Sequence, residues 1–562
     1  MKITNRILTG YEDTKLMHYK DLPSTFPNTV NYEDLPNQEM RGVLKANRYV
    51  DGKLVQTYSE LENHVGVIAA TRLGKTSEYV IPTILSFAKQ KTKKRMIISD
   101  PKGELYKTTA ETLRQEGYNV KLFNFRDYQH SEYWNPLTPI YRLYQKAYSI
   151  EDEVGIVDTD HGVRNIFRGI IYESQEELDE AIDRAQSILM EEVGNEIDKI
   201  AMITISTVNG RDPYWEDSAR ILLTALIWAM LEDSHPEEGE EAITEEKFSF
   251  STALTIMDSM RDGNGSNYND DGFFTSRKAT SKALALAKNC ILENASTTRK
   301  CIISSFNTKM SIYKSSTIRL ITSCNSFEMN ELIDEEKPIA IFIAYKDELK
   351  AHYQVISSLV QNAYSYLIEH ANQKPSGKLD VPFYFILDEF GNFPKIVDFE
   401  TVVSACAGRN IWFILILQSY AQLNNVYGQH IAEIIRDNLN LHVFIGSNNP
   451  ETLNEFSKEC GQATRISPLC ALNGNKEEIE TYQIETIPLM PKSILAGLKV
   501  GECIVTEANC GYVLYSKLER YFQCAEFNQL PLADDKKYIT AINPLDRKYA
   551  YVRKPKNNDW DF

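Results

Sequence analysis

The sequence has no excess of basic residues. Its 562 residues include 61 Lys and Arg against 78 Asp and Glu, which gives a formal net charge of -17. This balance excludes a protein coated with basic surface for nucleic acid, so any contact with DNA is confined to a local patch or a channel. An acidic total does not exclude DNA as a partner.

Paired cysteines and long apolar runs are also absent from the sequence. The nine cysteines stand singly, without a C-x-x-C pair or a matching histidine cluster, which excludes a disulfide framework or a zinc site and indicates reduced cytosolic thiols. The N-terminus is polar, and the longest apolar runs, at 221–230 and 411–417, are too short to span a membrane. We therefore expect a soluble globular protein that is not itself anchored.

The stretch AATRLGKT, from Ala69 to Thr76, has the pattern of a phosphate-binding loop. An apolar run rich in Val and Ile precedes it and a helical pattern follows it, as such a loop requires. In G-x-x-x-x-G-K-[ST], the glycine lets backbone N–H groups approach phosphate, the lysine reaches the outer phosphates and the hydroxyl binds magnesium. The predicted nucleotide-binding residues are Thr71, Arg72, Leu73, Gly74, Lys75, Thr76 and Ser77, with Thr76 also a magnesium ligand.

Ala69 stands where the motif has its first glycine. Alanine can serve there only if its φ angle stays negative. For an isolated match of this quality an ordinary strand-to-helix turn is the alternative, so the hypothesis needs a partner carboxylate.

Two strand ends offer that carboxylate. The continuous apolar run VPFYFIL is typical of a central strand, and it ends in Asp388 and Glu389. We predict that Asp388 binds magnesium and that Glu389 is the general base, with a solvated turn as the alternative. The run RMIISD ends in Asp100, where Pro101 and a helical pattern follow, so helix capping and metal binding are equally open there.

A third apolar strand, NIWFILILQ, ends in Gln418. A polar amide at the tip of a strand beside the Asp388 strand is placed to sense the γ-phosphate, and Arg409, just before that strand, is placed to act on the nucleotide of a neighbouring subunit. Both residue types are also common on surfaces, and that reading stays open.

The long gap between Lys75 and Asp388 indicates an insertion in an α/β fold. Strand-like runs alternate with helical patterns on both sides of the gap, which predicts a parallel sheet flanked by helices. The acidic run at 232–247 marks a boundary, interpreted as a solvated linker, and a helical pattern follows it. The predicted parts are a nucleotide-binding domain at 1–231 and 321–530, an inserted all-alpha domain at 232–320, and a basic and aromatic tail at 531–562.

Taken in order, the motifs resemble the coupling proteins of conjugation and type IV secretion. The resemblance rests on AATRLGKT, SDPKGELYKTT, YWNPL, DPYWEDSARILLTALIWAM, LDEFGNFPKI and LILQSYAQL, and it covers about 60 to about 525. It implies a RecA-like P-loop ATPase that uses ATP and Mg²⁺ and carries an inserted all-alpha domain. Phosphate loops of this family often have Ala in place of the first Gly. The resemblance assigns Lys75 and Thr76 to phosphate and metal, Asp388 and Glu389 to the acidic pair, Gln418 to the sensor and Arg409 to the arginine finger.

The resemblance also implies partners. Members of the family are typically hexameric when active, and they pass relaxase-bound single-stranded DNA from the relaxosome to a secretion channel and its ATPase. Cargo would be selected on the inserted all-alpha domain. The family usually begins with two membrane-spanning helices, and none is evident here, so we expect a separate small membrane protein to hold this cytoplasmic chain at the inner face of the membrane.

Two other functions and one further contact are open from the sequence. A double-stranded DNA pump should carry a C-terminal winged helix, for which nothing after 525 is patterned. A docking receptor without ATP turnover predicts a broken site, whereas the loop and both carboxylates are in place. The run DRKYAYVRKPKNN at 546–558 interleaves basic and aromatic residues that could touch DNA, anionic lipid or a channel protein, although a solvated tail is the commoner case.

Overall fold

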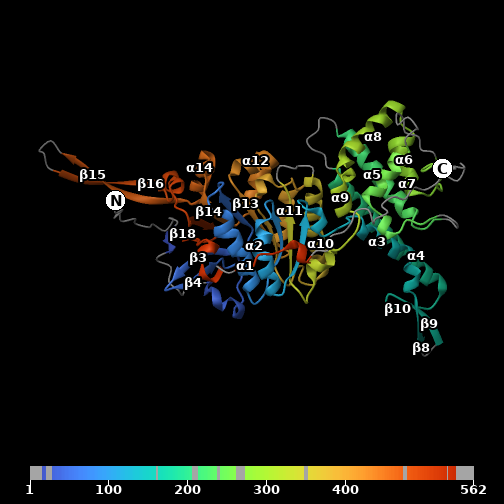
Figure 1. Ribbon diagram of the computed structural model, residues 1–562, viewed down its shortest axis with the longest axis horizontal. Helices are drawn as coiled ribbons and strands as arrows, with labels where there is room; N and C mark the ends of the chain where they lie inside the picture. The colour runs from blue at the N-terminus through green and yellow to red at the C-terminus, as the bar shows by residue number, and fades with distance from the viewer. Residues whose placement is uncertain are drawn as a thin grey trace. The chain divides into compact units, whose positions relative to one another are not determined.

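The computed structural model divides the chain into two compact units (Figure 1). The first unit contains the described residues of 1–126, 329–350 and 363–538, and the second contains those of 127–328 and 351–362. The structure describes residues 15–19, 28–159, 162–205, 213–236, 241–260, 272–346, 352–472, 478–527 and 530–538. The chain therefore leaves the first unit and re-enters it twice.

A ten-stranded sheet forms the framework of the first unit. Seven neighbouring strands run parallel, in the spatial order β14, β5, β13, β12, β6, β11, β7. Their bounds are β5 (Val65–Ala69), β6 (Arg95–Asp100), β7 (Asn119–Asn124), β11 (Ile339–Ala344), β12 (Phe383–Leu387), β13 (Ile411–Leu417) and β14 (Leu441–Gly446). The predicted parallel sheet is confirmed, and strands from both sides of the long gap lie side by side in it.

Beyond β14 the sheet becomes mixed. Antiparallel β17 (Glu502–Glu507) pairs with β14, antiparallel β18 (Tyr512–Lys517) pairs with β17, and β1 (Lys15–His18) closes the order. The C-terminal strands β17 and β18 are therefore separated by β14 alone from β5, the strand that precedes the predicted phosphate loop.

The central strands of the sheet are apolar along their whole length, so both of its faces need to be covered by helices. Every residue of β5, β11 and β12 is buried, as expected for parallel strands that have helices on either face. The helices of this unit are α1 (Ile81–Lys89), α2 (Glu104–Gln115), the second half of α10 (Tyr353–Gln373), α11 (Phe399–Ala407), α12 (Tyr420–Tyr427), α13 (Gln429–Asp437), α14 (Pro450–Glu459), α15 (Lys492–Ala496) and α16 (Asp535–Tyr538).

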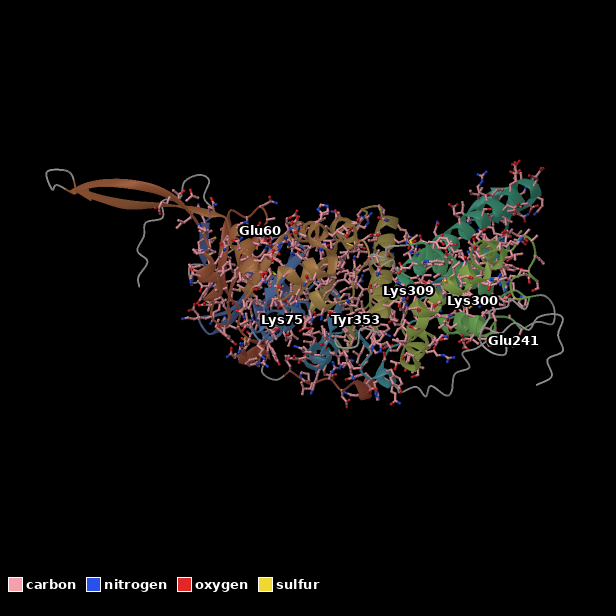
Figure 2. The ribbon with its side chains drawn as sticks, turned by 90° about the horizontal axis from the view of Figure 1, so that it is seen from above. Glu60, Lys75, Glu241, Lys300, Lys309 and Tyr353 are labelled. Carbon is pink, nitrogen blue, oxygen red and sulfur yellow. The ribbon has the colours of Figure 1, made fainter. Side chains whose placement is uncertain are left out.

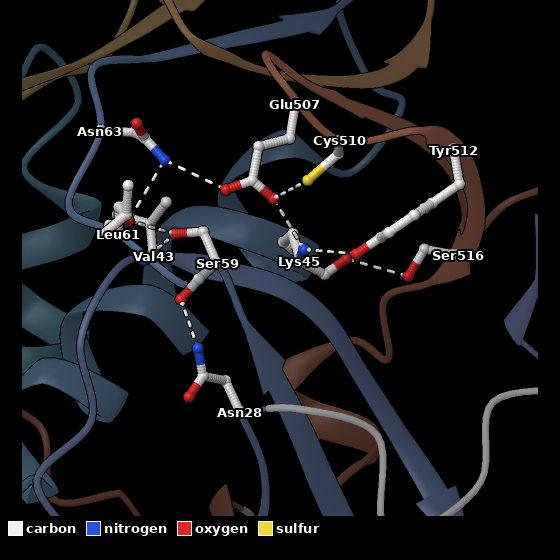
Figure 3. Close-up of polar contacts among 10 residues, drawn as sticks. All are labelled: Asn28, Val43, Lys45, Ser59, Leu61, Asn63, Glu507, Cys510, Tyr512 and Ser516. Atoms are coloured by element: carbon white, nitrogen blue, oxygen red, sulfur yellow. Dashed lines mark hydrogen bonds and ion pairs between the residues drawn. The ribbon is translucent and has the colours of Figure 1, made fainter. Parts of the chain in front are cut away.

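Two smaller sheets belong to the first unit. One has the order β2 (Thr29–Asn31), β4 (Lys53–Tyr58), β3 (Leu44–Val50), and the other is the hairpin of β15 (Gln462–Leu472) and β16 (Glu478–Pro488). Figure 3 shows how β3 is joined to the C-terminal strands: the buried Lys45 ammonium contacts Glu507 at 2.8 Å and the Tyr512 hydroxyl at 3.2 Å. Because a buried charge is costly unless it is paired, these contacts fix β3 against β17 and β18.

Helices dominate the second unit. They are α3 (Thr138–Tyr148), α4 (Gln175–Thr204), α5 (Tyr214–Glu232), α6 (Phe250–Ser259), α7 (Lys282–Ala287), α8 (Ser296–Met310), α9 (Ser316–Ile321) and the first half of α10. Helix α5 packs against α4, α6, α7 and α8, and its residues from Leu222 to Leu231 are all buried. The apolar run at 221–230 is therefore the central helix of this unit.

The unit boundary differs from the predicted one. The helical unit begins at Asp127, whereas we expected it to begin at 232. It also contains a small sheet of β10 (Ile170–Tyr172), β9 (Gly162–Phe167) and β8 (Gly155–Thr159). These strands lie in the part that we expected to belong to the nucleotide-binding domain, at 1–231. The elements described within the predicted all-alpha part, 232–320, are all helices.

The acidic run at 232–247 is also not a solvated linker in its described part. Glu232 and Asp233 accept hydrogen bonds from Arg277, and Ile243 is fully buried. Glu232 and Asp233 are therefore paired with an arginine more than forty residues later in the sequence.

In the part of the chain that the structure describes, no helix is long and apolar enough to cross a membrane. The eight cysteines with described side chains are all free thiols. The basic and aromatic run at 546–558 lies outside the described residues.

Candidate active site

The phosphate loop connects β5 to the short π-helix η3 (Lys75–Val80). Gly74 has φ 93°, a left-handed conformation that favours glycine, and Arg72 is left-handed as well, with φ 69°. Ala69 is the last residue of β5, and it is not among the described residues with positive φ. Alanine therefore fits at the position where the motif has its first glycine.

The Lys75 side chain, labelled in Figure 2, lies between the two predicted carboxylates. Its Nζ is 3.2 Å from Asp388 Oδ1 and 3.2 Å from Glu389 Oε1, and all three side chains are less than 10% exposed. Burial raises the pKa of Asp388, and the Lys75 ammonium opposes that rise. A lysine more than three hundred residues before the acidic pair thus meets both acids at one edge of the sheet.

The end of β12 holds the acidic pair in a tight turn. Glu389 is left-handed, with φ 55°, and its N–H donates to Asp388 Oδ1 at 3.0 Å. The Ser99 hydroxyl of β6 donates to the Asp388 carbonyl at 2.9 Å. Lys102 Nζ lies 3.6 Å from Glu389 Oε1 and is largely exposed. The left-handed turn aims the two adjacent carboxylates at the same lysine.

Gln418 reaches the loop from the neighbouring strand β13. Its Oε1 accepts a hydrogen bond from the Thr71 hydroxyl at 3.2 Å. Its backbone N–H donates to Gln422 Oε1 at 3.0 Å. A Cβ added to Gly391, just after the acidic pair, would collide with the Gln422 side chain, so that position needs glycine. Gln422 therefore connects the acidic-pair turn to the strand end that carries Gln418.

Comparison with known proteins agrees with this geometry. Residues 28–468 match the family described as Type IV secretory system Conjugative DNA transfer. The chain belongs to this family. It is 22% identical over 506 residues to the conjugal transfer protein TraG of Escherichia coli, covering 84% of this chain and 69% of TraG. It is 23% identical over 403 residues to VirD4 of Rhizobium radiobacter, covering 71% of this chain and about half, 48%, of VirD4.

The fold of this family member is that of the plasmid coupling protein TrwB. The TrwB structure in complex with ADP and Mg²⁺ superposes with a TM-score of 0.57 at 14% identity, over 92% of this chain and 94% of TrwB. This similarity confirms the RecA-like fold class that the motifs implied.

Thr76 and Ser77, the two loop residues that follow Lys75, lie in η3. Thr76 comes directly after Lys75 in η3 and is half-buried, and the Ser77 hydroxyl donates to the Gly74 carbonyl at 3.2 Å. Hydroxyl and carboxylate oxygens are the donors that Mg²⁺ prefers. Among the described residues, no group of three or more His, Cys, Asp and Glu side chains could hold a metal ion. The Thr76 hydroxyl and the Asp388 carboxylate are oxygen donors of the kind that magnesium prefers, and their assignment as its ligands stays a prediction.

Arg409 lies away from this site. It precedes β13, at the amino edge of the parallel strands, whereas Lys75 and Asp388 lie at the carboxyl edge. Its Nε donates to Asn372 Oδ1 at 2.8 Å and its guanidinium also donates to the Ala405 carbonyl at 2.8 Å. Among the described residues, Arg409 thus lies at the opposite edge of the sheet from the predicted nucleotide-binding residues of its own chain, and its role toward a neighbouring subunit stays a prediction.

Asp100 caps a helix beside the site. Its Oδ2 accepts a hydrogen bond from the Tyr106 N–H of α2 at 2.8 Å. Burial raises the pKa of Asp100 to about 6, the α2 amides oppose the rise, and the nearby Asp388 adds to it. The capping role is thus observed, and the Asp100 carboxyl lies close enough to Asp388 to influence it.

Sequence reasoning missed several residues that shape this site: Ser99, Lys102, Gly391 and Gln422. Lys102 and Gly391 lie inside the motifs DPKGEL and DEFGNF, so the motifs themselves were the available signal. Gln422 lies inside the motif LILQSYAQL, but the motif does not indicate its role, which depends on the backbone of Gln418 and the missing side chain of Gly391.

Proposed function

We propose that this chain is an ATP-dependent coupling protein that takes relaxase-bound single-stranded DNA and delivers it to a type IV secretion channel. The observation that carries the proposal is the contact of Lys75 with both Asp388 and Glu389 at the end of a phosphate loop. Family membership supports the transfer role. TrwB, which has the same fold, was solved with ADP and Mg²⁺ and with a non-hydrolysable ATP analogue.

Each site residue has one role in this proposal. Lys75 and the loop N–H groups hold the outer phosphates, and the oxygens of Thr76 and Asp388 hold Mg²⁺. The Glu389 carboxylate accepts a proton from the attacking water, and Gln418 responds to the γ-phosphate through its amide. Mg²⁺ supplies positive charge that offsets the charge of the transferred phosphoryl group.

The balance of charge in the described site supports these roles. The Lys75 ammonium faces two buried carboxylates at equal distances, and the second ammonium near them, that of Lys102, is largely exposed. The buried groups alone therefore carry one more negative than positive charge. A buried pair of acids keeps a net negative charge that a divalent cation would compensate. Lysine is also a compact point charge, which exchanges partners more readily than a bidentate arginine does.

The assembly and the partners are part of the same proposal. Arg409 acts on the nucleotide of the adjacent subunit in a homo-hexamer, a role that its position outside its own chain's site permits. Relaxosome cargo binds the helical unit. A separate small membrane protein holds the chain at the inner face of the membrane, beside the channel ATPase.

This function is tested by measuring ATP hydrolysis over a range of protein concentration. The assay is run with single-stranded DNA, with double-stranded DNA and without DNA. We expect a steep rise with concentration, because the arginine comes from a neighbour, and stronger stimulation by single-stranded than by double-stranded DNA. Preference for double-stranded DNA would favour a duplex pump. Tight ATP binding with no hydrolysis under any condition would favour a nucleotide-gated docking receptor.

A further inference from the structure

Glu78 is a buried acid in the first turn after the phosphate loop. Its side chain is fully buried, and its Oε1 accepts a hydrogen bond from Arg520 Nε at 2.9 Å. Arg520 is 26% exposed and follows β18, far along the chain. The pair therefore joins the loop to the C-terminal side of the sheet.

Glu78 packs directly against the glycine of the loop. Its N–H donates to the Gly74 carbonyl at 2.7 Å. A Cβ added to Gly74 would collide with the Glu78 carboxylate. The carboxylate thus fills the space behind the left-handed glycine, next to the lysine that faces the phosphates.

The segment that carries Arg520 is itself held in place. The Glu519 N–H donates to the Asn47 carbonyl at 2.8 Å, and the Asn47 side-chain amide donates to the Glu519 carbonyl at 3.3 Å. The Leu518 N–H donates to the Gly501 carbonyl at 2.8 Å. Backbone hydrogen bonds to β3 and to the start of β17 therefore fix the position from which the Arg520 guanidinium reaches Glu78.

We propose that Glu78 and Arg520 are a charge-compensating pair, in which the Arg520 guanidinium cancels the negative charge that Glu78 places beside the phosphate loop. The proposal rests on the nucleotide-binding function proposed above. Without Arg520, a buried and uncompensated carboxylate would lie behind Gly74 and repel bound phosphate. Without Glu78, the guanidinium would add attraction for phosphate.

The full-length chain tests this pair through its affinity for ADP with Mg²⁺, measured by calorimetry. We expect Arg520→Gln to weaken ADP binding about tenfold or more, since a like charge is unmasked near the phosphates. Glu78→Gln should bind ADP at least as tightly as the natural chain. The double variant should return to within about threefold of the natural affinity. Arg520→Lys keeps the charge and should recover most of the loss.

Arg436→Gln is the matched control. Arg436 pairs with Glu455 in the same unit, but it lies near the amino end of β14, whereas the phosphate loop lies at the carboxyl end of β5. Loss of this pair should therefore leave ADP affinity unchanged. Opposite effects of the Arg520 and Glu78 variants are the result that a merely structural ion pair would not produce.

Three results would overturn the proposal. Unchanged affinity in Arg520→Gln is the first. Equal weakening in Arg520→Gln, Glu78→Gln and the double variant is the second, because it would indicate a structural role alone. If Arg520→Gln does not fold, weaker binding by Glu78→Gln decides against the pair. Failure of the natural chain to bind ADP, with Lys75→Ala as reference, would instead remove the proposed function together with the pair.

Discussion

Each unit of the molecule buries one cation between two acids, and the two arrangements differ in how the cation is held. In the helical unit, the Arg277 guanidinium donates to both oxygens of Asp233 at 2.9 Å and to Glu232 at 3.1 Å. In the first unit, the Lys75 ammonium lies 3.2 Å from Asp388 and from Glu389. The charges are the same, but the geometry is not.

The backbone around each cation explains the difference. Glu232 is the last residue of helix α5, and it also accepts hydrogen bonds from the Ser281 hydroxyl and the Ala283 N–H. Both oxygens of its carboxylate therefore have partners within the unit. Gly74 and Glu389 are left-handed and belong to turns. Arg277 is bidentate and its two acids have all their partners within the unit, which suits a role in stability. Lys75 is a single ammonium beside turns with left-handed residues, which suits exchange of its carboxylate partners for a ligand.

Removal of Lys75 should give the largest effect on function. In Lys75→Ala we expect ATP hydrolysis to fall about a hundredfold to a thousandfold, because the cation proposed to hold the outer phosphates is lost. Steady-state hydrolysis by the purified full-length chain measures this. Arg277→Met should hydrolyse ATP at the natural rate per folded molecule, and equal loss in both variants would contradict the comparison.

Removal of Arg277 should give the largest effect on stability. Arg277→Met leaves Asp233 and Glu232 without their cation, so we expect the free energy of unfolding of the helical unit to fall by about 3–5 kcal/mol. Chemical denaturation followed by circular dichroism measures the change. The exposed pair of Arg142 with Glu245 offers the control, because Arg142→Gln should cost less than about 1 kcal/mol.

His64 extends the comparison to a buried group that is held neutral. Burial lowers its pKa to about 4, its Nε2 contacts the Val403 carbonyl at 2.9 Å and its Nδ1 accepts from the Phe413 N–H at 3.0 Å. Because the pKa is higher in the unfolded chain, this group contributes stability above about pH 6.5 that is lost as the pH falls toward 4, by up to about 3 kcal/mol.

The His64 effect is measured by urea unfolding of the natural chain and of His64→Gln between pH 7.5 and 4.5. Asp100 acts in the opposite direction, since its pKa is raised to about 6, and it contributes equally to both proteins. We expect the stability difference between the two proteins to shrink as the pH falls. A constant difference across this range would show that His64 is not the responsible group.

The smallest effect concerns Gly391. Gly391→Ala should displace the Gln422 side chain and break its hydrogen bond with the Gln418 N–H. We expect ATP hydrolysis to slow several-fold, which corresponds to an activation barrier raised by about 1 kcal/mol. Gly408→Ala is the matched control, because a Cβ there meets only the Ala405 carbonyl at 3.8 Å. Equal rates in the two variants would rule out this role for Gln422.

The sequence was sufficient to predict which distant residues meet at one edge of the sheet. Gly74, Lys75 and Thr76 form a short motif, and Asp388 and Glu389 end an apolar run, so one edge of a parallel sheet had to bring them together. The contact of Gln418 with Thr71 follows from the same rule, because β13 lies between β12 and β5.

Pairings between distant residues could not be predicted in this way. Nothing near Glu78 in the sequence indicates Arg520, and nothing near Glu232 indicates Arg277. The start of the helical unit at Asp127 was missed for a similar reason, because the packing partners of α3 and α4 are set by tertiary contacts rather than by composition. Burial of a charge demands a partner, but it does not say where in the chain the partner lies.

The most direct test of the central claim is ATP hydrolysis by Glu389→Gln. The carboxamide keeps the size of the side chain and removes the proposed general base, so we predict tight binding of ATP with hydrolysis reduced by about a hundredfold or more. Glu451→Gln, an exposed acid in the first turn of α14, should behave as the natural chain does. Hydrolysis by Glu389→Gln at the natural rate would contradict the assignment of this buried lysine and acid cluster as the catalytic site.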